Sequence, residues 1–124
     1  GDKKEEAAEE QLSSRDQTFI GRLRDSIRQN MGDSDFTVER LGEELGLSRV
    51  QLYRKVKALT GQTPVDLLKK ARLERARLLV VKTDKSISEI AYEVGFTAPS
   101  YFNKCFKDEF GVSPGVLRER GSQL

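Results

Sequence analysis

One helix-forming stretch carries side chains that could hydrogen-bond to the edges of nucleic-acid bases. Apolar residues in 49–59 recur at helical spacing and are expected to face inward: Leu52, Val56 and Leu59. The side chains left on the outside are Val50, Gln51, Tyr53, Arg54 and Lys57. In the DNA major groove, the fork of an Arg matches guanine and the carboxamide of a Gln matches adenine. Exposed Arg and Gln occur on many helices, so this interpretation depends on the surrounding elements.

A diverged copy of this stretch returns later in the chain. Residues 46–64 read GLSRVQLYRKVKALTGQTP, and residues 95–114 read GFTAPSYFNKCFKDEFGVSP. Each copy opens with a Gly and a large apolar residue, contains an apolar pair four residues apart, and closes with a Gly three residues before a Pro. In the second copy the expected outward residues are Ser100, Asn103, Lys104 and Lys107, and the expected core residues are Tyr101, Phe102, Phe106 and Phe110. A shared internal plan indicates one task performed twice.

The residues upstream of each copy complete a helix-turn-helix. TVERLGEEL leads into Gly46 and SISEIAYEV into Gly95, with a small residue, Gly42 or Ala91, four positions before the turn. Two short helices that cross steeply need a small side chain at their contact, and a turn residue with positive φ favours Gly. The alternative is a helical hairpin repeat with no nucleic-acid role, which the shared spacings disfavour.

Capping signals place several helix starts. Ser48-x-x-Gln51 and Ser86-x-x-Glu89 both have the pattern of a capping box. A Thr-Pro pair at 63–64 starts a long helix that runs to about residue 82, because Thr is a good cap and Pro suits the first helical position. About nineteen residues at roughly 1.5 Å each span about 28 Å, against about 34 Å between successive major-groove faces.

The predicted fold is all-α: two helix-turn-helix units joined by a long connecting helix, with an extra N-terminal packing helix, about seven helices in total. The expected parts of the 16–124 domain are a packing helix (16–31), a first unit (about 37–62), the connecting helix (about 64–82), a second unit (about 86–111) and a short last helix from Pro114. Residues 1–15 are polar and are interpreted as a linker, a cloning remnant or a frayed helix extension.

Composition excludes several classes of chemistry. The 124-residue chain has no His and one cysteine, Cys105, so an internal disulfide, a standard zinc site and His-dependent catalysis are all ruled out. It also lacks a P-loop, a GxGxxG motif and any apolar run of membrane-spanning length. We therefore expect no cofactor, no metal, no enzyme activity in this chain, no membrane partner and a cytoplasmic location.

Positive charge is concentrated in the middle of the chain. The net charge is only +2, yet residues 49–85 contain eleven basic and three acidic residues, a local surplus of eight. Helix surfaces of mixed sign are usually just solvated, but this clustering indicates a polyanionic partner.

With both units placed, the chain resembles the DNA-binding domain of the AraC/XylS family of bacterial transcription regulators over about residues 17–120. The resemblance rests on RLERARLLV (72–80), SISEIAYEVGF (86–96), SYFNKCFKDEFGVSP (100–114) and the LR at 117–118. SRVQLYRKVKALTGQTP in the first unit is similar to the subgroup at the C-terminus of hybrid two-component sensors, where a histidine kinase lies elsewhere in the polypeptide.

The resemblance implies two recognition helices in adjacent major-groove segments of double-stranded DNA. By position it implies base-reading residues at Val50, Gln51, Tyr53, Arg54, Pro99, Ser100, Asn103 and Lys104. Phosphate contacts are expected at Arg49, Lys57, Thr97 and Lys107. Pro99 has no side-chain hydrogen-bonding group, so one polar reader is missing from the second unit. RNA polymerase is a further candidate partner, and any dimerisation is expected through segments outside this sequence.

A second hypothesis gives the chain a different role. In it, the basic helix 64–82 docks an acidic protein partner, and the aromatic residues of the second copy serve only a core. DNA binding would then be weak, unspecific and indifferent to Gln51 or Asn103.

Overall fold

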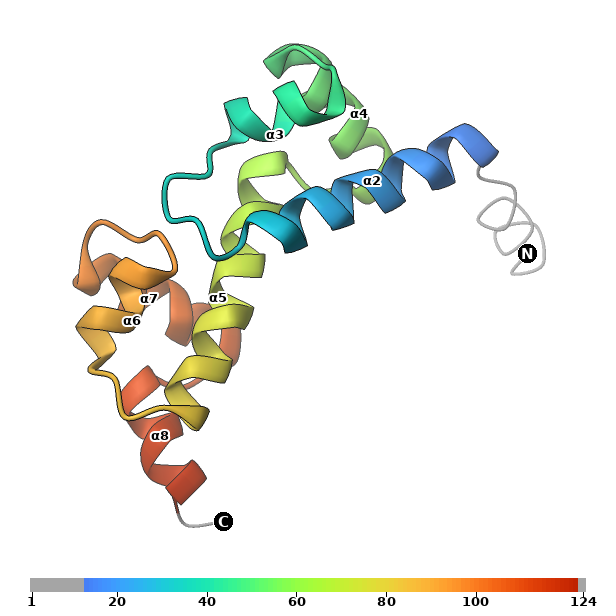
Figure 1. Cartoon of the computed structure of the whole chain (residues 1–124). Helices are drawn as coiled ribbons and strands as arrows, with labels where there is room; N and C mark the ends of the chain where they lie inside the picture. Colours follow the sequence, from blue (N-terminus) through green and yellow to red (C-terminus); the bar gives the residue numbers. More distant parts are fainter. Residues whose placement is uncertain (1–12, 123–124) are drawn as a thin grey trace, which may run out of the picture.

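Residues 13–122 are described by a computed structural model, and within them every regular element is an α-helix. The helices are α2 (Ser14–Asn30), α3 (Val38–Leu45), α4 (Arg49–Thr60), α5 (Pro64–Lys82), α6 (Ile87–Glu93), α7 (Pro99–Phe110) and α8 (Pro114–Ser122). α2–α4 pack around the first half of α5 and α6–α8 around its second half (Figure 1). The predicted all-α fold, with two helix-turn-helix units on a connecting helix, is confirmed. Of the segment 1–15, predicted to be a linker, a remnant or a frayed helix extension, residues 1–12 lie outside the described residues, whereas Ser13 caps α2 and the next two residues belong to that helix.

Side-chain caps fix where most of these helices begin. The hydroxyls of Thr37, Ser48, Thr63 and Ser86 each accept a hydrogen bond from the backbone amide three residues ahead. Such a bond satisfies one of the free amides of the first turn. The predicted box at Ser48 is complete, because the Gln51 side chain returns the bond. At Ser86 only the bond from the Glu89 amide is present among the described residues.

The two turns are built alike. Gly46 and Gly95 have φ of 71° and 98°, in the region that favours glycine. The amide after each glycine donates back to the carbonyl of the small residue in the preceding helix: Leu47 to Gly42 and Phe96 to Ala91, both at 2.9 Å. The small-residue prediction is therefore explained, because the chain folds directly over that position in both units.

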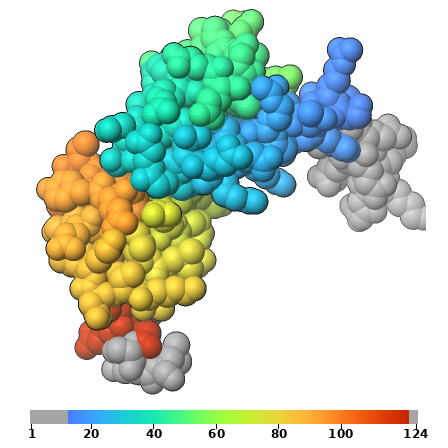
Figure 2. Space-filling model, in the orientation of Figure 1, coloured from blue at the N-terminus to red at the C-terminus, as the bar shows by residue number. Residues whose placement is uncertain are grey.

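Each unit has its own hydrophobic core, and α5 contributes to both. The first core consists of Phe19, Leu23, Phe36, Leu41, Leu45, Leu52, Val56 and Leu68. The second consists of Leu73, Ala76, Val80, Ile90, Ala91, Val94, Phe96, Phe102, Cys105 and Phe106. The space-filling view shows an elongated molecule with two lobes, α2–α4 in one and α6–α8 in the other, and α5 contributes residues to the cores of both (Figure 2).

Three large apolar or aromatic residues are exposed, and one of them, Tyr101, was predicted to lie in the core. Leu78 and Val81 of α5 are 54% and 51% exposed, and Tyr101 of α7 is 53% exposed. Leu78 lies between Ala76 and Val80, two positions from each, and two helical positions correspond to about 200° around the axis. Since Ala76 and Val80 face the second core, Leu78 must point away from it.

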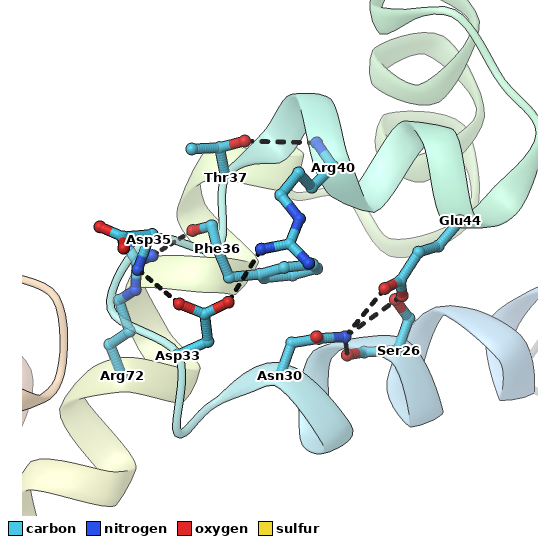
Figure 3. A network of polar contacts seen from close by, with 9 residues as sticks. All are labelled: Ser26, Asn30, Asp33, Asp35, Phe36, Thr37, Arg40, Glu44 and Arg72. Carbon is cyan, nitrogen blue, oxygen red and sulfur yellow. Dashed lines mark hydrogen bonds and ion pairs between the residues drawn. The ribbon is translucent and has the colours of Figure 1, made fainter.

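Polar contacts hold the outer helices in place. In α8, the Arg118 guanidinium donates to the carbonyls of Val80 (3.0 Å) and Thr83 (3.2 Å), at the carboxyl end of α5. Between α2 and α3, the buried Ser26 hydroxyl donates to the Glu44 carboxylate, which also accepts from the Asn30 amide at 3.2 Å (Figure 3). Within residues 13–122, no helix combines the length and apolar character needed to cross a membrane.

Candidate nucleic-acid interface

The outer face of α4 presents the predicted base-reading residues of the first unit to solvent. Val50 and Tyr53 are 59% and 50% exposed, and Gln51 and Arg54 are also exposed. Leu52 and Val56 are fully buried on the opposite side of α4, so the helix must turn this face to solvent. Arg54 has no hydrogen bond or ion pair to another described side chain. Its guanidinium is thus free to meet an external acceptor.

Gln51 has a structural task as well as an exposed position. Its carboxamide oxygen accepts a hydrogen bond from the Ser48 amide at 2.9 Å, while its own amide donates to the Ser48 hydroxyl at 3.2 Å. The NH₂ group of the carboxamide therefore remains as the donor available to a ligand.

Two of the predicted phosphate-binding residues already have intramolecular partners. Arg49 lies 2.9 Å from the Glu39 carboxylate in an exposed ion pair, which contributes little to stability. The Lys57 ammonium donates to the Gly61 carbonyl at 3.1 Å, at the carboxyl end of α4. Thr97 and Lys107 are exposed, the first in the turn before α7 and the second in the last turn of that helix.

α7 presents the corresponding face of the second unit. It begins at Pro99, which is half-buried, and its cap residue Ala98 makes no side-chain capping bond. Ser100, Asn103 and Lys104 are exposed, and no described side chain pairs with them. The structure thus places these three on a common outer face, whereas Pro99 supports the helix start.

Tyr101 is an exposed residue of this face that the sequence reading assigned to the core. The N-caps Ser48 and Ala98 are 50 residues apart, and the same offset takes Gln51 to Tyr101. Aligning the two copies by this offset could have identified Tyr101 as an outward residue from the sequence alone. A hydrogen bond with the Cys105 thiol raises the pKa of Tyr101, and the charge of nearby Lys69 opposes this to a smaller extent. The phenol is therefore neutral near pH 7 and can donate a hydrogen bond.

A cleft of about 560 Å³ separates the starts of the two outer helices. Its lining includes Arg49 from α4, Lys69 from α5, Thr97 from the turn before α7, and Tyr101 from α7. Chemically, the arrangement offers hydrogen-bond donors and positive charge on two helices, with further cations between them. Residues 13–122 contain no group of three potential ligands placed to hold a metal ion.

Comparisons with known proteins agree with this geometry. A family model described as a helix-turn-helix domain matches residues 41–120, more than half of the chain. The chain is 37% identical over 112 residues to histidine kinase P4 of Formosa agariphila, covering 90% of this chain and 8% of that kinase. It spans 8% to 34% of the length of three curated relatives that it matches.

Two solved structures show the same fold. A transcriptional regulator with an AraC-type DNA-binding domain from Chromobacterium violaceum superposes with a TM-score of 0.79 at 26% identity, covering 90% of this chain and 98% of that one. The DNA-binding domain of the global transcriptional factor AdpA, solved in complex with a target DNA, superposes with a TM-score of 0.70 at 28% identity, covering 80% and 91%. The chain therefore belongs to the AraC-type family of helix-turn-helix domains found in transcription regulators.

Proposed function

We propose that this chain is a sequence-specific module of a bacterial transcription regulator that binds double-stranded DNA. The observation that carries the proposal is the repeated outer face: two helices, α4 and α7, pack on different halves of α5 and present unpaired polar side chains. The nineteen residues of α5 span about 28 Å, close to the distance of one helical turn of DNA. Each outer helix would then enter its own major-groove segment.

Different side chains would have different tasks in this complex. Arg54, Asn103 and Lys104 would read bases, because they are exposed and free to form new hydrogen bonds. Lys107 and Thr97 would contact phosphates and set the register without reading sequence. Arg49 would have to exchange its Glu39 partner for phosphate, and Lys57 would have to leave the Gly61 carbonyl.

The parent protein would be a hybrid two-component regulator in which this domain is the output module. The support is the likeness to a named histidine kinase of which this chain matches only a small part. Kinase activity would belong to the rest of that polypeptide, and this domain would have no catalytic role. Dimerisation would likewise lie outside this sequence. The domain would work in the cytoplasm, where DNA and RNA polymerase are its expected partners.

Selection of bound duplexes from a random pool tests the proposal. The winner and a scrambled duplex are then titrated by fluorescence anisotropy at several salt concentrations. We expect two short boxes about ten base pairs apart, and at least tenfold tighter binding than the scrambled control. A single box would leave base reading to the first unit alone. Equal binding to every duplex, with a steep salt dependence, would refute sequence-specific recognition and favour the acidic-partner hypothesis.

Three alanine variants separate the proposed tasks. Arg54→Ala should weaken binding to the selected duplex by about 1–3 kcal/mol and binding to the scrambled duplex far less. Lys107→Ala should weaken both duplexes similarly and reduce the salt slope by about one. Arg24→Ala is the control, since it removes an equal charge from α2, where Arg24 lies beside the carboxyl end of α4. If Arg54→Ala weakened both duplexes equally, its assignment as a base reader would be wrong.

A further inference from the structure

The two helix-turn-helix units are connected mainly through α5. Leu68 of this helix belongs to the first core and Leu73 to the second, and the two cores are separate clusters. Among residues 13–122, the helices of one unit pack far more on α5 than on the helices of the other. The relative orientation of α4 and α7 therefore depends on the contacts made near the junction of the two units, between Leu68 and Leu73 of α5.

Arg72 lies at this junction and reaches the first unit. Its guanidinium donates a hydrogen bond to the backbone carbonyl of Phe36, in the loop that leads into the Thr37 cap of α3 (Figure 3). The negative charge of Asp33, in the same loop, attracts it as well. Asp33 is held by a bond from the Asp35 amide (2.9 Å) and by Arg40 (2.8 Å). These bonds hold the loop in place, so that its Phe36 carbonyl and its Asp33 carboxylate both favour the Arg72 guanidinium.

The same guanidinium also lies against the turn of the second unit. A Cβ atom built on Gly95 would come within 2.9 Å of the Arg72 Nε atom and 3.0 Å of its Cζ atom. Gly95 is the turn residue between α6 and α7, with a φ of 98°. One side chain therefore contacts backbone of both units, 23 residues away in one direction and 36 in the other.

We propose that Arg72 is a positioning residue that sets the distance along DNA between the two recognition helices. It would do so by fixing the angle between the units, and so the number of base pairs tolerated between the two boxes. This inference rests on the proposed two-helix binding of DNA. Successive base pairs of B-DNA are about 3.4 Å apart along the helix axis. A small change of angle at Arg72 would therefore move α7 by about one base pair relative to α4.

The experiment uses duplexes that contain both selected boxes at the preferred spacing and at one or two base pairs more or fewer. Affinities are measured for the wild type, Arg72→Met and Lys70→Met. Lys70→Met is the matched control, because it removes a charge from an exposed position on the same helix. A duplex with only the first box reports whether the first unit still binds.

We expect the wild type and Lys70→Met to lose at least tenfold in affinity when the spacing changes by one base pair. Arg72→Met should lose threefold or less, while its affinity for the single box stays within twofold of the wild type. A purely structural role would lower both affinities together and leave the spacing preference unchanged. That outcome, or an Arg72→Met profile as sharp as that of Lys70→Met, would overturn the inference.

A second variant keeps the test decisive if Arg72→Met does not fold. Arg72→Lys retains the charge and the apolar stem but lacks the planar fork that spans the Phe36 carbonyl and the Gly95 backbone. It should also flatten the spacing profile, and a folded Arg72→Lys with a wild-type profile would refute the proposal. A wild type that is indifferent to spacing would instead contradict two-helix binding itself, so the two failures are distinguishable.

Discussion

The contact between α3 and its turn predicts opposite effects for the same substitution at two glycines. Gly42 lies inside α3 and Gly21 inside α2, two helices that pack around the first core, and Ala is favoured over Gly in a helix by about 0.5–1 kcal/mol. At Gly21 nothing lies within 4 Å of an added Cβ atom. At Gly42 that atom would be 2.9 Å from the Leu47 carbonyl oxygen and 3.7 Å from the Leu52 side chain.

The magnitude follows from this geometry. A carbon and a carbonyl oxygen normally approach to about 3.3–3.6 Å. The turn would thus have to move by about half an ångström. The Leu47 carbonyl is backbone, and its neighbouring amide is bonded to Gly42 at 2.9 Å, so the shift disturbs the turn itself. Overpacking of this kind costs about 1–3 kcal/mol, which exceeds the gain in helix propensity. We expect Gly42→Ala to destabilise the domain by about 0.5–2 kcal/mol and Gly21→Ala to stabilise it by about 0.5–1 kcal/mol.

Urea unfolding followed by circular dichroism at 222 nm measures both variants against the wild type. A change of 1 kcal/mol in a domain of this size shifts the thermal midpoint by about 4 °C, so thermal melts give an independent reading. Because both glycines lie in helices that pack around the first core, separate unfolding of the two cores would not distort the comparison. If Gly42→Ala stabilised the domain as much as Gly21→Ala does, the packing argument for the small residue would be refuted.

Three further predictions concern single side chains. Tyr101→Ala should weaken binding by about 1 kcal/mol on duplexes that contain the second box and have no effect on a first-box duplex; anisotropy measures both. Gln51→Glu keeps the acceptor that caps α4 while adding a negative charge, so thermal stability should hold while DNA affinity falls; a matching loss of stability would contradict the capping role. A bond from the Asp35 amide and one from Arg40 lower the pKa of Asp33 below 3.8. As the pH falls below 3.8, Asp33 takes up a proton more readily in the unfolded state than in the folded state. Its contribution to stability is therefore present above pH 3.8 and lost as the pH falls further. In Asp33→Asn, the urea midpoint should fall less steeply with decreasing pH than in the wild type.

Local rules in the sequence predict the helix boundaries well. The connecting helix was expected at about 64–82 and is found at Pro64–Lys82. Its start depends on a Thr-Pro pair that acts within one turn. The Ser48 cap and the two turn glycines could be predicted equally well, because a cap or a positive φ depends on a few neighbouring residues. The outward faces of α4 and α7 followed from the apolar spacing of each copy.

The sequence predicted less well where the answer depended on distant parts of the chain. Tyr101 was assigned to the core because it is aromatic and adjoins Phe102. In the structure Phe96, Phe102 and Phe106 already fill that space, with ring centroids 5.2 and 5.7 Å apart, and Tyr101 remains outside. In the sequence, Arg72 contributed only to the basic surplus and to the RLERARLLV motif, with no contact predicted for it. Its contacts with Phe36 and Gly95 arise from how the units fold onto α5, and no local periodicity encodes them.

The third residue of each outer helix shows how the two copies have diverged. In the first copy, Gln51 commits its carboxamide oxygen to the Ser48 amide, so α4 is well capped. A two-bond contact with adenine needs that oxygen as well as the NH₂ group. Gln51 can therefore offer DNA a single donor while the cap persists. In the second copy Ala98 cannot form such a cap, and the equivalent residue, Tyr101, projects outward. We accordingly expect Arg54, which has no competing partner among the described residues, to discriminate bases more strongly than Gln51.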